Sequence, residues 1–274
     1  MAAAEPLAET MAEPMVVVDD LHVVYRVFGS KSDKGTAATA LWRIMRRQRR
    51  PSVREVHAIR GVSFVANRGD AVGVIGRNGS GKSTLLRAIA GLLPPEQGVV
   101  YTTGHASLLG VNAALLDDLT GERNVVVCGL AMGMTPREVK DRYQSIVDFS
   151  GVGDFINLPM RAYSTGMGSR LRFAIASARS HEVLLIDEAL VTGDAEFRVR
   201  SRQRIEELRA QAGTVFIVAH SMAQIEETCN RVIWLEKGQI VRAGDDVPAI
   251  IDAYLAATGG EPLVREGPKN PLTP

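Results

Sequence analysis

One nine-residue segment, GRNGSGKST at positions 76–84, constrains the fold more than any other feature of the sequence. Its spacing, G-x-x-x-x-G-K-[ST], lets glycine-rich backbone curl so that several N–H groups converge on phosphate oxygens. The apolar run AVGVI at 71–75 precedes it and predicts a buried strand, and residues 82–92 predict a helix. A strand, a glycine loop and a helix in this order predict a phosphate site at the edge of an open α/β sheet. An idle glycine turn is the alternative, and the strand and helix around it argue against that alternative.

We expect the whole loop and the first turn of the helix to surround a nucleotide triphosphate. The helix N-terminus adds unpaired N–H donors and a partial positive charge. Lys82 would neutralise the β- and γ-phosphates, and the hydroxyl of Ser83 would ligate Mg²⁺. The residues expected to contact ATP here are Gly76, Arg77, Asn78, Gly79, Ser80, Gly81, Lys82, Ser83 and Thr84.

The segment VLLIDE at 183–188 predicts the second half of this site. Four apolar residues indicate a buried strand, and the two carboxylates follow at its carboxyl end, where open α/β sheets bind ligands. Asp187 would hold Mg²⁺, and Glu188 would accept a proton from the water that attacks the γ-phosphate. A solvated strand end is the alternative interpretation, and it would be preferred if the phosphate loop were absent.

The rest of the chain predicts an α/β fold with a mainly parallel sheet covered by helices. Because each motif occurs once, we expect one nucleotide-binding unit per chain. Helices are predicted within 121–160, with breaks at 133–136 and 151–153, and at 197–211 and 246–257. The remaining strands are predicted at 15–18, 21–28, 56–65, 105–111, 215–219 and 232–235.

Composition limits the classes of partner. Lys and Arg number 32 against 31 Asp and Glu, a net charge of +1, so no bulk field attracts nucleic acid and we expect no nucleic-acid partner. No run of about 18 apolar residues predicts a membrane span. Residues 1–14 predict a disordered leader without the basic and apolar regions of a signal peptide, and the proline-containing residues 258–274 predict a disordered tail.

The segment YSTGM at 163–167 opens a predicted helix about twenty residues before the acidic strand, and there the chain resembles the ABC ATPases. The resemblance implies an ABC domain over 15–257, with an antiparallel β edge subdomain and a helical subdomain at 112–180 that carries this signature. It also implies that Ser164 and Gly166 form a second anion site, which closes over ATP held by another subunit. A homodimer with two ATP molecules at its interface would follow.

Further segments match the same family. VAH at 218–220 resembles its switch-histidine motif, so His220 would contact the γ-phosphate and orient Glu188, although a histidine after a strand is more often structural. Tyr25 stands where these ATPases place an aromatic ring against adenine, with core packing as the alternative. Asp194, in VTGD, resembles the loop that crosses the dimer interface.

Three departures from the generic pattern resemble the ATPases that export O-antigen polysaccharides and teichoic acids. The alanine-, valine- and arginine-rich sequence suggests a GC-rich genome, which together with this resemblance suggests a mycobacterial-type galactan exporter. The three departures are YSTGM in place of LSGGQ, the segment DEALVTGDAEF after the acidic strand, and a basic insertion at 37–50 that predicts an amphipathic helix. The segment LTGERN at 119–124 also resembles that subfamily. This implies an ATP-hydrolysing subunit on the cytoplasmic side of the cell membrane, which drives a polytopic permease to translocate a lipid-linked glycan. Another ABC transporter, or a soluble ABC ATPase without a transport role, is the alternative.

Two local features leave alternatives open. Five arginines between 43 and 50 could dock the insertion against an anionic leaflet or a pyrophosphate headgroup, or they could line a solvated surface helix. Residues 107–120 lack the glutamine that most ABC ATPases carry there, and Asn112 is the candidate replacement.

Overall fold

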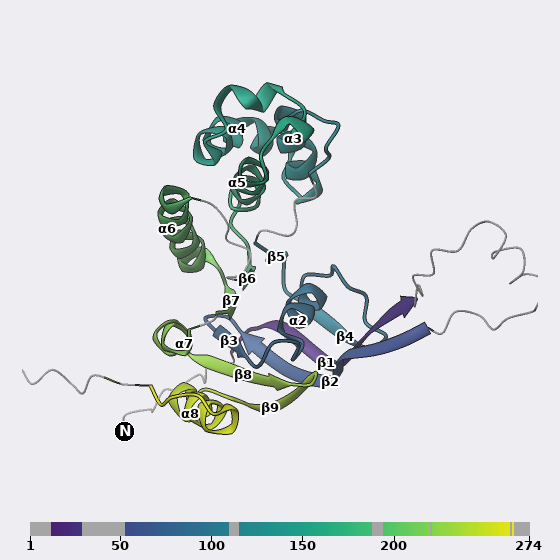
Figure 1. Cartoon of the computed structure of the whole chain (residues 1–274), viewed down its shortest axis with the longest axis vertical. Coiled ribbons are helices and arrows are strands. Elements are labelled where there is room, and N and C mark those ends of the chain that lie inside the picture. The colour runs from purple at the N-terminus through teal and green to yellow at the C-terminus, as the bar shows by residue number, and fades with distance from the viewer. Residues whose placement is uncertain are drawn as a thin grey trace, which may run out of the picture.

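A computed structural model describes residues 12–28, 53–109, 115–187, 194–219, 221–263 and 265 of the chain. Within this part the strands form two sheets, and a group of helices stands apart from both (Figure 1). The basic insertion at 37–50, Asn112, Glu188 and His220 lie outside the described residues, as do most of the predicted leader and tail.

The smaller sheet is antiparallel, with the order β2-β1-β4. Its strands are β1 (Pro14–Phe28), β2 (Val53–Asn67) and β4 (Gln97–Thr102). We predicted two strands at 15–18 and 21–28, but β1 is continuous, because the Asp19–Asp20 irregularity is a bulge. Asp20 has a φ of 45° there and its N–H donates to Ser63 Oγ at 2.9 Å. This sheet is the antiparallel edge subdomain that the resemblance implied.

The larger sheet has the order β5-β6-β7-β3-β8-β9. Its first five strands are parallel and β9 is antiparallel to β8. Because β7 lies between β6 and β3, the carboxyl ends of these three parallel strands are neighbours at one edge of the sheet. The strands are β5 (Ala106–Leu108), β6 (Val183–Asp187), β7 (Thr214–Val218), β3 (Ala71–Ile75), β8 (Arg231–Glu236) and β9 (Gln239–Gly244).

Alternating side chains of this sheet enter two apolar cores, as the strand periodicity of two requires. Leu185 and Phe216 face α2 (Lys82–Ile89) and the antiparallel sheet. Leu184 and Ile217 face the opposite side, toward α6 (Ala195–Gln211), α7 (Met222–Thr228) and α8 (Val247–Thr258). The helix α2 ends three residues before the predicted position, since Gly91 adopts a φ of 70°. The elements β4, β9 and α7 were not predicted.

The helical subdomain contains α3 (Gly121–Ala131), α4 (Pro136–Ser150), two 3₁₀ helices (Gly153–Asn157 and Met160–Ala162) and α5 (Thr165–Ala176). The predicted breaks are present. Gly133 and Gly151 have φ values of 82° and 61°, and Thr135 and Glu138 form a capping box at the start of α4. None of the helices in the described ranges is both long and apolar enough to cross a membrane.

The structure describes part of each end that the sequence predicted to be disordered. At the N-terminal end, β1 begins at Pro14, and Glu13 pairs with Arg68 at 2.6 Å. At the C-terminal end, Arg265 pairs with Glu226 of α7 at 2.6 Å and with Asp252 of α8 at 2.8 Å. A surface ion pair alone contributes little, but two on one guanidinium define where this residue lies.

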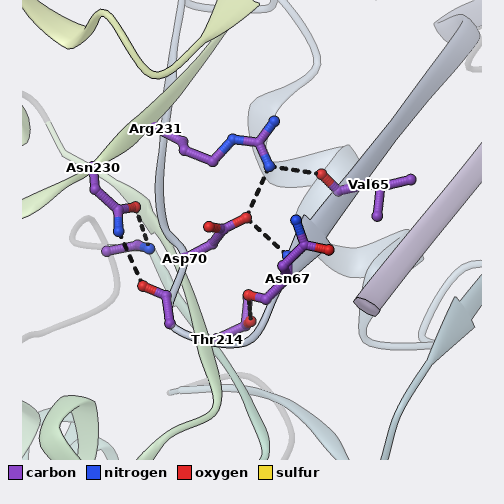
Figure 2. Close-up of polar contacts among 8 residues, drawn as sticks. Val65, Asn67, Asp70, Thr214, Asn230 and Arg231 are labelled. Carbon is purple, nitrogen blue, oxygen red and sulfur yellow. Dashed lines mark hydrogen bonds and ion pairs between the residues drawn. The ribbon is translucent and has the colours of Figure 1, made fainter. Parts of the chain in front are cut away.

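Polar side chains join the two sheets at the amino ends of the parallel strands, opposite the phosphate loop (Figure 2). The Asp70 carboxylate accepts from Asn67 N and from Arg231 Nη1, each at 2.8 Å, and Arg231 also donates to Val65 O at 3.0 Å. The hydroxyl of Thr214 donates to Asn67 O at 2.5 Å, and Asn230 accepts from Ala71 N at 2.8 Å. These bonds tie the end of β2 to the starts of β3, β7 and β8.

We expect Arg231→Met to lower the free energy of unfolding by about 2 kcal/mol, because the largely buried Asp70 carboxylate loses its charged partner. The Asp70 side chain is 15% exposed. The control is Arg161→Met, which removes an ion pair whose side chains are 70% and 91% exposed and should cost at most about 0.5 kcal/mol. Urea unfolding of both variants measures the difference, and equal losses would contradict the prediction.

Candidate functional site

The phosphate loop lies between β3 and α2 in a conformation that two glycines make possible. Gly76 and Gly81 have φ values of 148° and 111°. A Cβ on Gly76 would lie 2.2 Å from Leu235 O, and one on Gly81 would lie 2.6 Å from Ala58 O. Any side chain at either position would therefore push the loop off the strands that support it. The loop is a preorganised cradle of backbone N–H groups.

The turn between β8 and β9 contacts the phosphate loop and supports it. The sequence did not reveal that role. Gly238 N donates to Ser80 O at 2.9 Å, and Arg60 N of β2 donates to Gly238 O at 2.8 Å. A Cβ on Gly238 would lie 2.6 Å from Ala58 O. The turn itself was predicted at 236–238, but only the fold brings it under the loop.

Lys82 folds back across the loop that precedes it. Its Nζ donates to Gly76 O at 2.7 Å and to Arg77 O at 3.0 Å. Burial lowers the pKa of Lys82, while the charges of Asp187 and Glu236 oppose that shift. Close by, the buried Ser80 Oγ finds no hydrogen-bond partner in the described structure. An ammonium group and an unpaired hydroxyl around a nest of N–H groups are suited to phosphate oxygens.

Ser83 and Asp187 meet beside the loop, as the two motifs together predicted. Ser83 Oγ donates to Asp187 Oδ2 at 2.8 Å, and Asp187, the last residue of β6, is 8% exposed. Hard oxygen donors of this kind suit Mg²⁺, which takes one or two protein ligands and completes its shell with water and substrate phosphates. Within the described residues no group of three acidic, histidine or cysteine side chains could hold a metal by itself. The residues present fit a cation that binds together with a nucleotide.

Glu188 and His220 lie outside the described residues, but the ends of the strands that lead to them are adjacent. In the parallel pair of β6 and β7, Asp187 is the partner of Val218. The chain positions that follow therefore leave the sheet at the same edge as the phosphate loop, because β3 also pairs with β7. The structure brings the ends of β6 and β7 together, and the roles of Glu188 and His220 stay predictions.

Tyr25 belongs to β1, and its hydroxyl is 3.4 Å from Oγ1 of Thr84 in the first turn of α2. Its side chain is only partly buried, and it stands on β1 beside the phosphate loop rather than in either apolar core. This placement favours the predicted nucleobase contact over core packing. The contact itself remains a prediction.

The signature residues lie at the start of α5, in the helical subdomain. Ser164 is the N-cap, and its Oγ accepts from Met167 N at 3.2 Å. Gly166 is exposed, and the nearest atom to a Cβ built on it would be Ser164 Oγ at 3.9 Å. No residue in the described part of the chain therefore requires a glycine at 166. Figure 1 shows α5 among the helices and α2 against the sheets, so one chain does not bring the two anion sites together.

Comparison with known proteins places this geometry in a family. The model of the ABC transporter family matches residues 59–191. A Klebsiella pneumoniae protein named O-antigen export system ATP-binding protein is 38% identical over 205 residues, which cover 74% of this chain and 83% of that protein. A Bacillus anthracis protein named teichoic acids export ATP-binding protein is 39% identical over 198 residues, which cover 72% of this chain. The chain spans 36% of the length of that second relative.

Solved structures agree on the fold. One, described as the dimeric post-hydrolysis state of an ATP-binding cassette bound to ADP and Pi, aligns with a TM-score of 0.60 at 20% identity and covers 84% of this chain and 98% of its own. At that identity the likeness concerns architecture, and it confirms the predicted α/β fold with its antiparallel edge and helical subdomains. In that architecture the Ser83–Asp187 pair lies beside the phosphate loop, and the signature helix is capped by Ser164. The two relatives are close to 40% identical to this chain. This chain therefore belongs to the ABC transporter family of ATP-binding proteins.

Proposed function

We propose that this chain is the ATP-binding and ATP-hydrolysing subunit of an exporter that drives a partner permease to move a lipid-linked polysaccharide across the cytoplasmic membrane. The observation that carries the enzymatic part is the 2.8 Å contact between Ser83 Oγ and Asp187 Oδ2 beside the glycine loop. It joins two motifs that lie 104 positions apart in the sequence. Such a pairing serves a nucleotide triphosphate with its divalent cation.

The residues of the loop would hold the triphosphate and leave the chemistry to groups at the sheet edge. Lys82 would exchange its two carbonyl partners for phosphate oxygens and keep its charge close to the β- and γ-phosphates. Ser83 and Asp187 would hold Mg²⁺, which supplies neutralisation of phosphate charge when it is bound. Tyr25 would orient the adenine.

Hydrolysis would then proceed by in-line attack of water on the γ-phosphorus. The water oxygen bonds to phosphorus, the bond to the ADP oxygen breaks, and the water proton passes to Glu188. His220 would contact the γ-phosphate and keep Glu188 directed at the water. The products are ADP and phosphate, and positioning accounts for most of the acceleration.

A second copy of the chain would complete each site with its Ser164 and Gly166. The open space around Gly166 supports this, because a close approach by another molecule explains a glycine that its own chain does not need. The separation of α2 and α5 within one chain also requires a second chain. The related cassette of known structure is dimeric by its own description.

The transport substrate is inferred from the relatives and from the insertion. The relatives are named for O-antigen and teichoic acid export, which are polysaccharide substrates, and galactan is a third polymer of this class. The arginines at 43–50 would lie near an anionic lipid headgroup on the cytoplasmic side of the membrane. The permease would be a separate polytopic subunit.

Depletion of the chain from its own cell tests this proposal. We expect a lipid-linked glycan to accumulate on the cytoplasmic side, identified by mass spectrometry of extracted lipids, and export to return with the wild-type gene but not with Glu188→Gln. Arg43, Arg46 and Arg47 changed together to alanine should restore ATP hydrolysis in the assembled complex but restore export only in part. Unchanged glycolipids after depletion would contradict the substrate, and full export by the triple variant would reduce the insertion to a surface helix.

A further inference from the structure

A cleft of about 420 Å³ lies between α4, α5 and α6. A volume of this size is typical of sites that bind small organic molecules. One of its lining residues, Ala174, comes ten positions after Ser164 and therefore lies about 15 Å along α5 from the signature. The described residues that line the cleft include none of those assigned to ATP. An occupant would therefore bind without competing with a nucleotide.

The walls of the cleft combine an apolar surface with a positive charge. Ile146 and Phe149 of α4 and Ala174 of α5 give it an apolar side, and two of them, Ile146 and Ala174, are buried. The ionised side chains in its described lining, all from α6, are Arg200, Arg204 and Glu207. Two cations and one anion leave a net charge of +1 in the cleft. This lining favours an anion that carries an apolar body.

The two arginines differ in how far their donors are used. Arg204 donates from Nε and Nη2 to Ser177 O, at 3.0 and 2.8 Å, and from Nη1 to Glu207 Oε2 at 2.8 Å. Arg200, by contrast, donates no hydrogen bond to any described residue, and its buried Nε has no partner. Its Nη2 lies 3.9 Å from Glu196 Oε1, on a side chain that is 84% exposed. Donors left unused on a charged group are available to a ligand that supplies acceptors.

Two aromatic rings hold the Arg200 guanidinium in place. Its Cζ lies 5.9 Å from the ring centroid of Phe149 and 5.9 Å from that of Phe197. Contact with the face of a ring uses none of the N–H donors, because these point outward in the plane of the guanidinium. A side chain that is already ordered loses little entropy when it binds a ligand. Arg200 is therefore suited to bidentate recognition of a carboxylate or a phosphate.

We propose that this cleft is an accessory binding site for a small organic anion. Arg200 binds the carboxylate or phosphate group, and the apolar part of the ligand lies on Ile146 and Phe149. Because α4 and α5 belong to the helical subdomain and α6 follows strand β6 of the large sheet, an occupant contacts both parts of the chain. Its binding should therefore stabilise the folded protein, which gives a signal that does not depend on transport.

The test uses two probes that share an apolar bicyclic ring and differ in their anionic group. They are 2-naphthyl phosphate and 2-naphthoate. Both are titrated calorimetrically into the full chain with ADP and Mg²⁺ present, so that the phosphate loop is occupied. We expect a Kd of about 0.1 mM for at least one of them, and a rise in Tm at saturation. The uncharged 2-naphthol and inorganic phosphate, which lacks the ring, should each bind at least about tenfold more weakly.

Arg200→Met tests the assignment, because it keeps an apolar side chain against both rings and removes the charge. The affinity for the anion should fall at least about tenfold, and Arg200→Lys, which keeps the charge without the planar fork, should lose about threefold. Arg202→Met is the matched control. It removes the same charge from an exposed position of α6 outside the cleft and should bind like the wild type. Should Arg200→Met fail to fold, Ser145→Glu decides the question, because it places a carboxylate on the exposed rim and should weaken binding by a similar factor.

Hydrogen exchange locates the bound probe. With the tighter-binding anion present, amides of 142–150 and 200–211 should exchange more slowly, whereas those of α2 should keep the rate of the ADP-bound chain. Equal affinity in the wild type and in Arg200→Met, or binding of 2-naphthol as tight as that of the anions, would overturn the inference. Protection confined to α2, or no binding by either anion, would overturn it as well.

Discussion

Glu188→Gln should lower kcat for ATP hydrolysis by about 10³-fold while ATP affinity stays within about twofold. Glutamine has the size and polarity of glutamate, so the nucleotide site keeps its shape, but the amide cannot take the proton of the attacking water. Hydrolysis would stop after ATP has closed the dimer, and closed dimers should accumulate. Phosphate release measures the first effect, and gel filtration with ATP and Mg²⁺ measures the second.

A carboxylate beside the opposite end of β6 supplies the control for this variant. Glu182 lies just before the amino end of β6, where it accepts from His105 N at 3.1 Å, away from the phosphate loop. Glu182→Gln should retain wild-type turnover and remain monomeric after ATP is hydrolysed. Undiminished hydrolysis by Glu188→Gln, or an equal loss in both variants, would remove Glu188 from the role of general base.

Mixing two inactive variants should restore ATP hydrolysis to about a quarter of the wild-type rate. Lys82→Ala removes the cation of the phosphate loop, and Gly166→Glu fills the open space at the signature with a negative side chain. Each homodimer then has two defective sites and should lose at least about 100-fold in kcat. A mixed dimer carries both defects in one site and leaves the other site with an intact Lys82 and an intact Gly166.

The expected recovery follows from counting sites. Equal amounts of the two chains give about one half mixed dimers, and each has one of its two sites intact. Neither substitution should alter the fold, since a Cβ at 166 has space around it and the Lys82 ammonium donates to two carbonyls of its own loop. The matched control mixes Lys82→Ala with Lys82→Ala/Gly166→Glu, which leaves no intact site in the mixed dimer. If this control hydrolysed ATP as fast as the first mixture, the proposal that each ATP site is formed by two chains would be refuted.

The separation of the two halves of the site explains why each test needs its own measurement. In the proposed dimer, Lys82, Ser83 and Asp187 would act on the nucleotide of their own chain, and their loss would affect binding. Ser164 and Gly166 would act on the nucleotide of the partner, and their loss would affect closure.

The positions of the phosphate loop and of the acidic strand could be predicted from the sequence because they reside in local motifs. Glycine spacing determines how the loop at 76–84 can curl, and the four apolar residues before Asp187 indicate a buried strand, as observed. The breaks of the helical region at 133–136 and 151–153 were predicted correctly for the same reason, since glycine and an N-cap act on their immediate neighbours. Even the pairing of Ser83 with Asp187 follows once both motifs end at the same sheet edge.

Other features depended on contacts between residues far apart in the chain. The bulge at Asp20 keeps β1 continuous only because Ser63 and two neighbouring strands pair across it. The turn at Gly238 supports the phosphate loop because β2 and β9 meet there, and Arg170 reaches Asp194 because three phenylalanines pack α6 onto the signature helix. The sequence by itself thus predicted which groups would meet a nucleotide, and it determined the buried strand and the glycine loop that carry Lys82, Ser83 and Asp187. Only the tertiary structure decided how those groups are held together, because contacts between residues far apart in the chain leave no periodic pattern in the sequence.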